Sequence, residues 1–206
     1  MENRYRELGP ATLLSPTPVV LVSCADAADP GKKNMLTIAW AGVVNSEPPM
    51  VSISVRPERY SYDMIKASGE FVVNLVDENL SRATDFCGVR SGKDTDKAKE
   101  TGLAYVPAPG METAPAVDGA PLSLSCKVKQ VIPLGSHDLF LGEVAAIRAR
   151  EDLMDEKGAL HLERAKLVAY SHGLYQQLGD VTGFFGWSVA RPEVLERRMG
   201  EYRDNA

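Results

Sequence analysis

The feature that most constrains the fold is a series of strand-like segments that follow one another without regular helices between them. Residues 51–56 alternate between aliphatic and polar side chains, a period of two that is typical of a half-buried strand. The same alternation predicts a strand over 122–129, and apolar runs predict others over 18–24, 71–76, 138–147 and 166–170. This order favours antiparallel pairing, because parallel strands need crossover connections that are usually helical. We therefore expect a mainly β fold, a Greek-key barrel with appended short helices, and not a doubly wound sheet.

Three short helices are expected between the strands. Ser61 is a suitable N-cap for a helix that continues to residue 68 and ends at Gly69 in the left-handed conformation. A second helix is predicted over residues 79–87, with the next glycine as its end. Asp94 is a suitable N-cap for a third helix, which ends before Gly102.

We interpret the chain as one domain over residues 1–206, with a core over about 10–190 and a C-terminal tail over 191–206. Its 44% hydrophobic and 25% charged residues are typical of a globular protein. Residues 106–121 contain four prolines and are expected to be a surface excursion, because proline cannot donate to a sheet ladder. Gly142 lies inside an apolar run and predicts a bulge or tight bend.

The charge balance limits the class of partner. The chain has 23 Lys and Arg against 28 Asp and Glu, a formal net charge of -5. Nucleic-acid partners are not expected, because non-specific binding needs a basic face that displaces counterions from phosphates. One basic pocket for an anion is still compatible with this charge. There is no apolar signal core at the N-terminus and no run of the about 18 apolar residues that a membrane helix needs, so we expect a soluble, cytoplasmic protein.

The residues that usually hold metals are too scattered to predict a metal site. Cys24, Cys87 and Cys126 form no C-x-x-C pair, and the histidines are not at metal-ligand spacing. We interpret the cysteines as small buried residues of a protein in a reducing compartment. The sequence also lacks G-x-G-x-x-G, Walker A and G-x-S-x-G motifs. If the chain is an enzyme, its chemistry is expected to come from an organic cofactor.

A strand-to-helix turn provides the first candidate binding site. The polar face of the strand over 51–56 ends in Arg56, and Pro57 leads into the expected helix start at Ser61. A guanidinium, hydroxyl groups and free backbone N–H groups converge there, which suits a phosphate. The alternative is an ordinary turn in which Arg56 pairs with Glu58 or Glu70.

Three further segments carry polar groups that a ligand requires. In the first segment, Asn34 and Thr37 can present polar groups to the edge of a ligand. The alternative interpretation is that Thr37 is an ordinary strand residue and Trp40 belongs to the core. Residues 91–97 bring two lysines to a glycine-containing turn, whose alternative is a solvated loop. His137 precedes an apolar strand and can titrate at the mouth of a barrel, or it is an ordinary loop histidine.

Five segments, taken in order, carry a family resemblance: NMLTIAW (34–40), SVRPERYSY (54–62), GEFVVN (69–74), SGKDTDK (91–97) and GSHDLFLGEV (135–144). They resemble the flavin reductase-like family with the FMN-binding split-barrel fold, especially its flavoredoxin-type branch. The resemblance covers about residues 10–190. It implies a six-stranded antiparallel barrel that forms a homodimer, with one FMN per subunit near the dimer interface.

The resemblance also implies roles for individual residues. Arg56, Ser61 and Lys97 would hold the phosphate end of FMN, with Tyr62 and Ser91 close by. The isoalloxazine would be lined, through backbone and hydroxyl groups, by Asn34, Met35, Leu36, Thr37, Ala39, Trp40, Ser54 and Val55. His137 matches a histidine near the flavin and nicotinamide and is the candidate catalytic residue. The family's closing segment, from the same subunit or its partner, would contain Tyr170, Tyr175, Leu178 and Gly179.

The implied activity is that of an FMN-dependent oxidoreductase. A hydride passes from NADH or NADPH to FMN, and electrons then go on to an acceptor. One alternative is an FMN electron carrier that serves a redox protein without significant NAD(P)H activity, and another is a flavin-binding module without turnover. Residues 113–120 depart from the more acidic segment of many relatives, which leaves the acceptor open.

Overall fold

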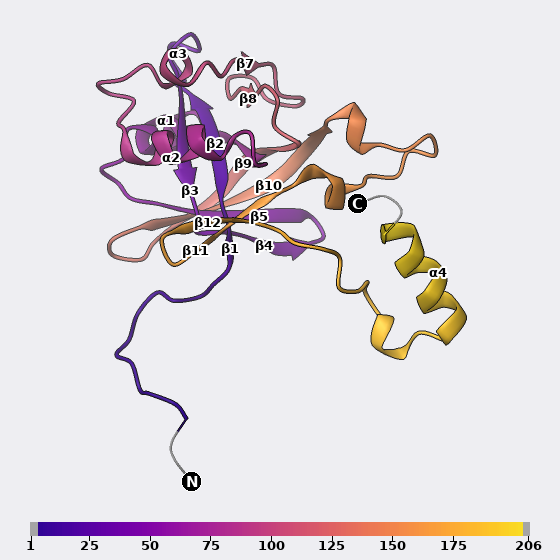
Figure 1. The fold of residues 1–206 in the computed structure, drawn as a ribbon. Coiled ribbons are helices and arrows are strands. Elements are labelled where there is room, and N and C mark those ends of the chain that lie inside the picture. The colour runs from indigo at the N-terminus through magenta and orange to yellow at the C-terminus, as the bar shows by residue number, and fades with distance from the viewer. Residues whose placement is uncertain (1–3, 204–206) are drawn as a thin grey trace.

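The computed structural model describes residues 4–203 and contains one large sheet surrounded by short helices (Figure 1). The sheet contains β2 (Val20–Ala25), β3 (Lys33–Ile38), β4 (Ala41–Ser46), β5 (Pro49–Val55), β6 (Glu70–Leu75), β9 (Leu122–Pro133) and β10 (Asp138–Ala149). The strand order is β3-β2-β6-β9-β10-β5-β4, and every neighbouring pair is antiparallel. The predicted mainly β, antiparallel fold is confirmed.

The sheet closes into a barrel because its two edge strands are consecutive in the chain. β3 pairs with β2, β4 pairs with β5, and only Ala39 and Trp40 separate β3 from β4. The Ser54 N–H donates a 3.0 Å hydrogen bond to the Trp40 carbonyl and holds this bend against β5. The sheet thus has seven strands where the family resemblance implies six, and the count becomes six when β3 and β4 are taken as one bent strand.

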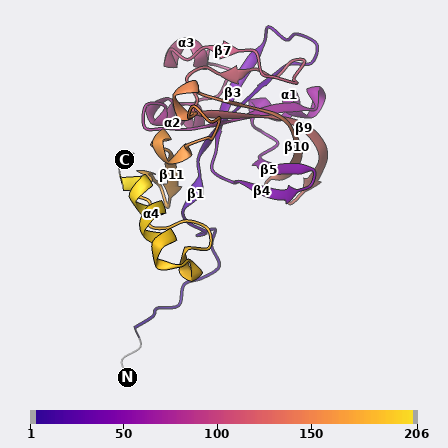
Figure 2. The same ribbon diagram turned by 90° about the vertical axis from the view of Figure 1, so that its right-hand side faces the viewer.

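Smaller elements surround the barrel. β1 (Thr17–Pro18), β11 (Val168–Ser171) and β12 (Leu174–Gln177) form a three-stranded sheet, and β7 (Tyr105–Val106) pairs with β8 (Ala116–Val117). α1 (Tyr60–Ser68), α2 (Ser81–Val89) and α3 (Lys97–Thr101) pack around β2 and β3. Short 3₁₀ helices occur at Glu151–Leu153, Leu162–Ala165 and Trp187–Val189. α4 (Pro192–Arg203) lies apart from the barrel (Figure 1, Figure 2) and belongs to the expected tail, whose last residues, 204–206, lie outside the described part of the chain.

Two hydrophobic clusters pack on opposite faces of the same strands. One fills the barrel and includes Val22, Ile53 and Phe71, which are fully buried. The other lies between the barrel and the surrounding elements α2, β8 and β11, and it includes Leu21 and Met35. Leu21 and Val22 point to opposite faces because side chains alternate along a strand. Both faces of β2 are covered, which is why its sequence is continuously apolar.

The three cysteines are free and buried within these clusters, as predicted. Burial raises the pKa of Cys24 and of Cys126 to about 12, and it raises the pKa of Cys87 to about 11. The thiols therefore remain protonated near pH 7 and are poor nucleophiles.

Two predicted helix caps are wrong, although the helices are present. Ser61 is the second residue of α1, and its Oγ accepts a 2.7 Å hydrogen bond from Asn34 Nδ2 on β3. Asp96, and not Asp94, accepts a hydrogen bond from the α3 backbone as its N-cap. Several short polar residues near each helix start are suitable caps, and tertiary contacts decide among them.

The glycines predicted to end helices behave in two different ways. Gly69 and Gly102 end α1 and α3 with φ angles of 68° and 72°. Gly88 does not end α2, because the helix continues through it and its C-cap is Arg90. A Cβ at Gly88 would lie 3.2 Å from the Cβ of Thr37, so this glycine lets α2 pack closely on β3.

The predicted irregularity at Gly142 is present, but the extra residue of the bulge lies on β9: Leu141 pairs with Gln130 and Gly142 with Val128, which leaves Lys129 between them. The register between β9 and β10 shifts between Leu141 and Gly142. A Cβ at Gly142 would lie 2.5 Å from Cζ of Phe71, so a larger residue would displace that ring from the barrel core.

The segment 106–121 is not a plain surface excursion, which corrects the prediction. Its residues Ala114, Ala116 and Val117 are buried, and the segment packs against the outer face of β6. The buried Glu70 carboxylate accepts hydrogen bonds from the backbone N–H groups of residues 112–114 at distances of 2.8 to 3.2 Å. A side chain remote in sequence therefore satisfies backbone donors that a proline-rich loop otherwise exposes to water.

Candidate functional site

Two adjoining cavities lie between β3, β5, α2 and the start of α1. The large cavity has a volume of about 760 Å³, and the basic cavity has a volume of about 390 Å³. Both are lined by Leu36, Thr37, Arg56, Arg59 and Gly88, so they meet along this wall. The large cavity and the basic cavity together form one elongated site.

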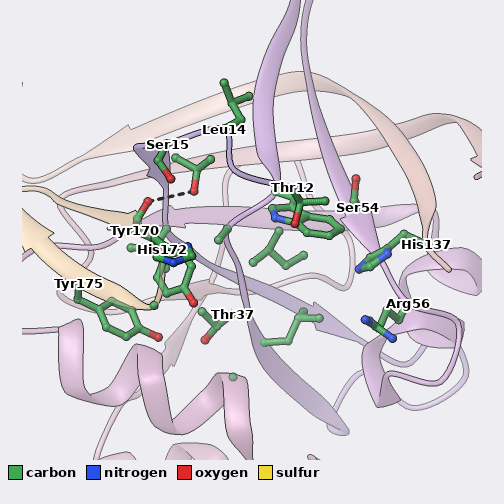
Figure 3. Close-up of a pocket in the computed structure, with 18 of the residues that line it drawn as sticks. Thr12, Leu14, Ser15, Thr37, Ser54, Arg56, His137, Tyr170, His172 and Tyr175 are labelled. Carbon is green, nitrogen blue, oxygen red and sulfur yellow. Dashed lines mark hydrogen bonds between the residues drawn. The ribbon is translucent and has the colours of Figure 1, made fainter. Parts of the chain in front are cut away.

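His137 lines one end of the large cavity (Figure 3). The ring of Trp40, which also lines this cavity, lies against it with the ring centroids 4.5 Å apart. Trp40 lies in the bend between β3 and β4 and is 44% exposed, so it is not a core residue. His137 lies in the turn between β9 and β10, and its Nδ1 is 2.9 Å from Ser136 Oγ. Burial, with a further contribution from the Arg56 guanidinium, lowers the pKa of His137. The imidazole is therefore neutral near pH 7.

The β11–β12 hairpin lines the other end of the large cavity, together with Ser15 of the N-terminal segment (Figure 3). Tyr170 and Tyr175 pack edge to face with ring centroids 5.5 Å apart, and the Tyr175 hydroxyl donates a 3.2 Å hydrogen bond to Asp85 on α2. His172 occupies the two-residue turn with a φ of 47°. Within the described chain the predicted closing segment thus reaches its own subunit's cavity through Tyr170 and Tyr175, whereas Leu178 and Gly179 do not line it.

The basic cavity gathers positive charge on a chain whose net charge is -5. Arg56, Arg59, Arg90 and Lys97 line it, against the single carboxylate of Glu58. Arg56 Nη1 lies 3.4 Å from Glu58 Oε1, an exposed contact that leaves other guanidinium donors available. The arrangement suits an anion with several acceptor oxygens.

Lys97 is the buried member of this group. It is only 4% exposed, and its Nζ donates to the carbonyls of Met35 at 2.8 Å and Cys87 at 2.7 Å. Burial lowers the pKa of Lys97. Its ammonium therefore joins β3 to the end of α2 and adds positive charge to the wall of the cavity.

Asn34 fixes the loop that carries Ser91. Its Nδ2 donates to Ser61, which is itself 1% exposed. A Cβ at Gly92 would overlap Asn34 Oδ1 and lie 2.8 Å from Cδ1 of Tyr60, so only glycine allows the loop to approach this closely. In this position Ser61 orients Asn34, and Ser91 lies at the rim of the cavity.

The structure brings most predicted site residues together. The large cavity is lined by Leu36, Thr37, Ala39, Trp40, Ser54, Val55, Arg56 and His137, and the basic cavity by Asn34, Leu36, Thr37, Arg56, Ser61, Ser91 and Lys97.

Two predicted residues are not brought to either cavity. The Met35 side chain packs in the outer cluster, because it alternates with Asn34 and Leu36 along β3. Tyr62 packs edge to face on Phe140 inside the barrel, and its hydroxyl donates a 2.5 Å hydrogen bond to Asp138. Their side chains therefore stabilise the walls of the site.

Sequence reasoning missed several residues that line the cavities. Arg59 and Arg90 could have been found from the sequence, because they lie close in the chain to the candidate residues Arg56 and Ser91. No local pattern indicates Thr12 or His172, because these residues approach the cavity only through the pairing of β1 with β11.

The chain belongs to the flavin reductase-like family, since the family model described as "Flavin reductase like domain" matches residues 13–179. An uncharacterized protein of Halalkalibacterium halodurans is 27% identical over 210 residues, covering 96% of this chain and 95% of that protein. A protein of Pseudomonas syringae named "FMN reductase (NADH) RutF" is 28% identical over 119 residues, covering 58% of this chain and 64% of that protein. The flavoredoxin of Desulfovibrio vulgaris superposes with a TM-score of 0.82 at 27% identity, covering 90% of this chain and all of that one.

Residues 4–203 lack two other kinds of feature, a metal cluster and a membrane-spanning helix. No group of three or more His, Cys, Asp or Glu side chains there is placed to hold a metal ion. No helix in that part of the chain is long and apolar enough to cross a membrane.

Proposed function

We propose that the chain is an FMN-dependent oxidoreductase that takes a hydride from NADH or NADPH and passes electrons to an acceptor. The observation that carries this proposal is the junction of a large cavity, containing aromatic and aliphatic side chains, with a smaller cavity lined by four cations and one carboxylate. A ligand that joins a planar ring to a phosphate requires both a cavity for the ring and a basic cavity for the phosphate. A flavin nucleotide is such a ligand, and it is consistent with the family to which the chain belongs.

The basic cavity would hold the phosphate. Arg56 and Arg59 offer guanidinium donors, and α1 begins with Tyr60 beside them, so its first N–H groups and helix dipole favour the same anion. Lys97 adds positive charge from inside the wall, while its own donors remain on Met35 and Cys87. Gly92 and Asn34 set the position of the loop that borders this cavity.

The large cavity would hold the ring system and the nicotinamide. Bound FMN would supply the redox chemistry, accepting a hydride from a reduced nicotinamide stacked on it. Leu36, Ala39 and Val55 offer an apolar wall, which excludes water from the reacting atoms. His137, held neutral, would orient the nicotinamide from the Trp40 end of the cavity.

We also propose a homodimer formed by one-domain subunits. Exposed aliphatic side chains support it, since Leu14 on the rim of the large cavity is 85% exposed and Val43 on β4 is 83% exposed. A second copy is a suitable cover for such side chains. Light scattering of the protein as it elutes from a size-exclusion column measures its mass and tests this proposal. A monomeric mass at micromolar concentration would contradict it.

The flavoredoxin similarity favours a second candidate function. An electron carrier would bind FMN tightly and exchange electrons with a redox protein without reacting with NAD(P)H. Both candidates share the same FMN site and differ only in access for the nicotinamide.

The visible spectrum of the purified chain, followed by anaerobic addition of NADH and then NADPH, tests the proposal. We expect a flavin spectrum, present at purification or after addition of FMN, that at least one nucleotide bleaches. Bound flavin that neither nucleotide bleaches would favour the carrier. A colourless protein that binds neither FMN nor FAD would overturn the flavin assignment.

A further inference from the structure

We propose that Tyr62 and Asp138 form a buried positioning pair, which holds His137 in place at its end of the large cavity. Both residues lie outside the walls of the large and basic cavities, so neither contacts the ligand in the proposed function. The inference rests on the proposed role of His137, because the pair acts on the reaction only through that imidazole.

The contact joins α1 to the first residue of β10. The Tyr62 hydroxyl donates a 2.5 Å hydrogen bond to Oδ2 of Asp138 and accepts one of 3.4 Å from Nζ of Lys66. Tyr62 and Asp138 are 7% and 9% exposed, and the Tyr62 ring packs edge to face on Phe140. A short hydrogen bond between a hydroxyl and a buried carboxylate is strong and directional, so it fixes α1 and β10 relative to each other.

Asp138 directly follows His137, at the point where an exposed turn enters the barrel. Residues 133–136 are exposed, whereas Asp138 is paired with Val55 in the sheet. Successive side chains of a strand point to opposite faces, so the Asp138 carboxylate faces the barrel interior while His137 faces the large cavity. The bond to Tyr62 therefore fixes the backbone from which the imidazole extends to its place beside Trp40.

Stability alone does not account for a carboxylate at this position. Tyr62 and Phe140 belong to the apolar cluster that fills the barrel, and a carboxylate beside them loses its hydration. An apolar side chain at position 138 would avoid this loss, because buried polar pairs are often no more stable than apolar replacements of similar size. What the pair provides instead is a defined geometry for the end of the turn.

The same start of α1 also borders the basic cavity. Tyr60 and Ser61 line that cavity, and Ser61 accepts the hydrogen bond from Asn34. Tyr62 is the next residue of the helix. One turn of α1 thus carries both a wall of the proposed phosphate cavity and the anchor of His137, which sets the spacing between the phosphate and nicotinamide ends of the site.

Anaerobic rapid mixing of the FMN-loaded protein with NADH or NADPH measures the effect of the pair on the reaction. Tyr62→Phe keeps the ring and removes the hydroxyl. We expect it to slow bleaching at saturating nucleotide about fivefold, with less than about a twofold change in FMN affinity. Asp138→Asn keeps an acceptor for the hydroxyl and should stay within about twofold of the unaltered rate. Tyr105→Phe, whose hydroxyl lies outside the large and basic cavities, is the matched control and should change neither quantity.

The double variant Tyr62→Phe/His137→Ala decides whether Tyr62 acts through His137. We expect it to be no slower than His137→Ala alone, because the orienting contact is then already lost. Rate losses that multiply in the double variant would overturn the inference, since a general disturbance of the barrel adds to the loss of the imidazole.

The fluorescence of Trp40 gives a second readout that does not depend on the proposed activity. In a Trp187→Phe background Trp40 is the sole tryptophan of the chain, and a protonated imidazole in contact with an indole quenches its emission. We expect the emission of the flavin-free protein to fall between about pH 8 and about pH 5, as His137 is protonated, and this fall to be at least about twofold smaller in Tyr62→Phe.

An identical pH response in the two proteins would overturn the inference. An unaltered chain whose bound flavin is bleached by neither nucleotide would instead contradict the proposed function, and the Trp40 emission would still decide whether Tyr62 positions His137.

Discussion

The indole ring of Trp40 and the imidazole ring of His137 lie with their centroids 4.5 Å apart, although they come from opposite ends of the barrel sequence. Trp40 stands in the bend that closes the barrel, and His137 stands in the turn between β9 and β10. Closure of the sheet therefore also assembles this end of the large cavity. An aromatic ring beside a neutral imidazole offers a flat surface and a hydrogen-bonding group to one ligand.

The first prediction concerns His137. Replacement by alanine should slow the bleaching of bound FMN by a nicotinamide at least about tenfold, because the donor loses an orienting contact, while FMN remains bound. Anaerobic rapid mixing measures the rate. His161→Ala is the control, because that residue lies outside both cavities. An unchanged rate in the His137 variant would count against its assigned role.

The second prediction concerns the phosphate. Arg56→Ala should weaken FMN binding about tenfold, because it removes a charge-assisted hydrogen bond. Riboflavin, which lacks the phosphate, should bind both proteins equally. Arg82→Ala on α2 removes an arginine that lines neither cavity and should have no effect. Equal loss of FMN and riboflavin would indicate a general disturbance and not a phosphate contact.

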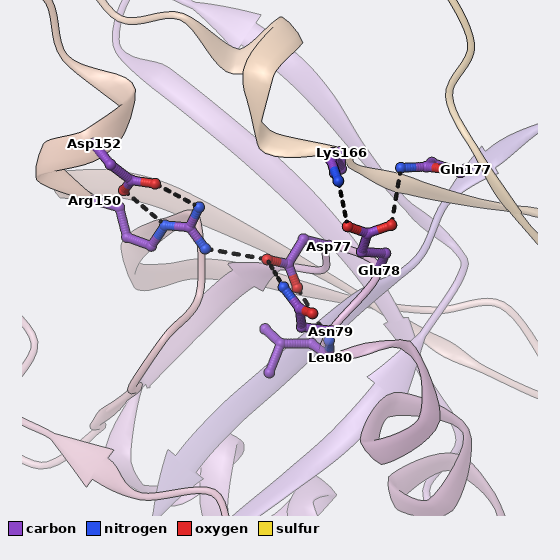
Figure 4. A network of polar contacts seen from close by, with 8 residues as sticks. All are labelled: Asp77, Glu78, Asn79, Leu80, Arg150, Asp152, Lys166 and Gln177. Atoms are coloured by element: carbon purple, nitrogen blue, oxygen red, sulfur yellow. Dashed lines mark hydrogen bonds and ion pairs between the residues drawn. The ribbon is translucent and has the colours of Figure 1, made fainter.

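The third prediction concerns a network that fixes the start of α2 (Figure 4). Arg150 Nη1 lies 3.1 Å from Asp77, whose side chain is 4% exposed, and Asp77 also accepts a 3.0 Å hydrogen bond from the Leu80 N–H. Arg150→Ala leaves this carboxylate buried without its cation. We expect a loss of about 2 kcal/mol in the free energy of unfolding, or about 5 °C in Tm.

Arg148→Ala is the matched control for this prediction. Arg148 pairs with Asp118 at 3.3 Å, but the two side chains are 39% and 58% exposed. Its loss should cost less than about 0.5 kcal/mol, because exposed pairs contribute little. Equal destabilisation of the two variants in thermal unfolding would refute the importance of the Asp77 contact.

The fourth prediction concerns pH and Glu70. Burial by itself raises the pKa of this carboxyl, but hydrogen bonds from the backbone of Thr113, Glu112 and Ala114 outweigh it and lower the pKa. Because the folded-state pKa is lowered, the stabilisation is present above the unfolded value of about 4.3 and is lost as the pH falls through the folded value.

Glu70→Gln should therefore be less stable than the unaltered chain by about 1 to 2 kcal/mol at pH 7, and the difference should narrow below about pH 4. Urea unfolding at both pH values measures it. A difference that stays constant with pH would show that packing, and not the charged hydrogen bonds, holds the segment 106–121.

Local sequence patterns determined a large part of this protein. The alternation in residues 51–56, the register shift beside Gly142 and the helix ends at Gly69 and Gly102 follow from backbone geometry over a few residues, and they are present in the structure. The ordered segments also carried enough information to indicate the family, which the match over residues 13–179 shows.

Only the tertiary structure decided which side chains share the site. Met35 and Tyr62 lie within the motifs but face the packed interior, whereas Arg90 and His172 lie outside them and line the cavities. The physical reason is the distance along the sequence over which each kind of interaction acts. Periodicity and capping act between neighbours in the chain, but the strand register that closes the barrel at Trp40 and the packing of α2 on β3 join residues that are far apart in sequence.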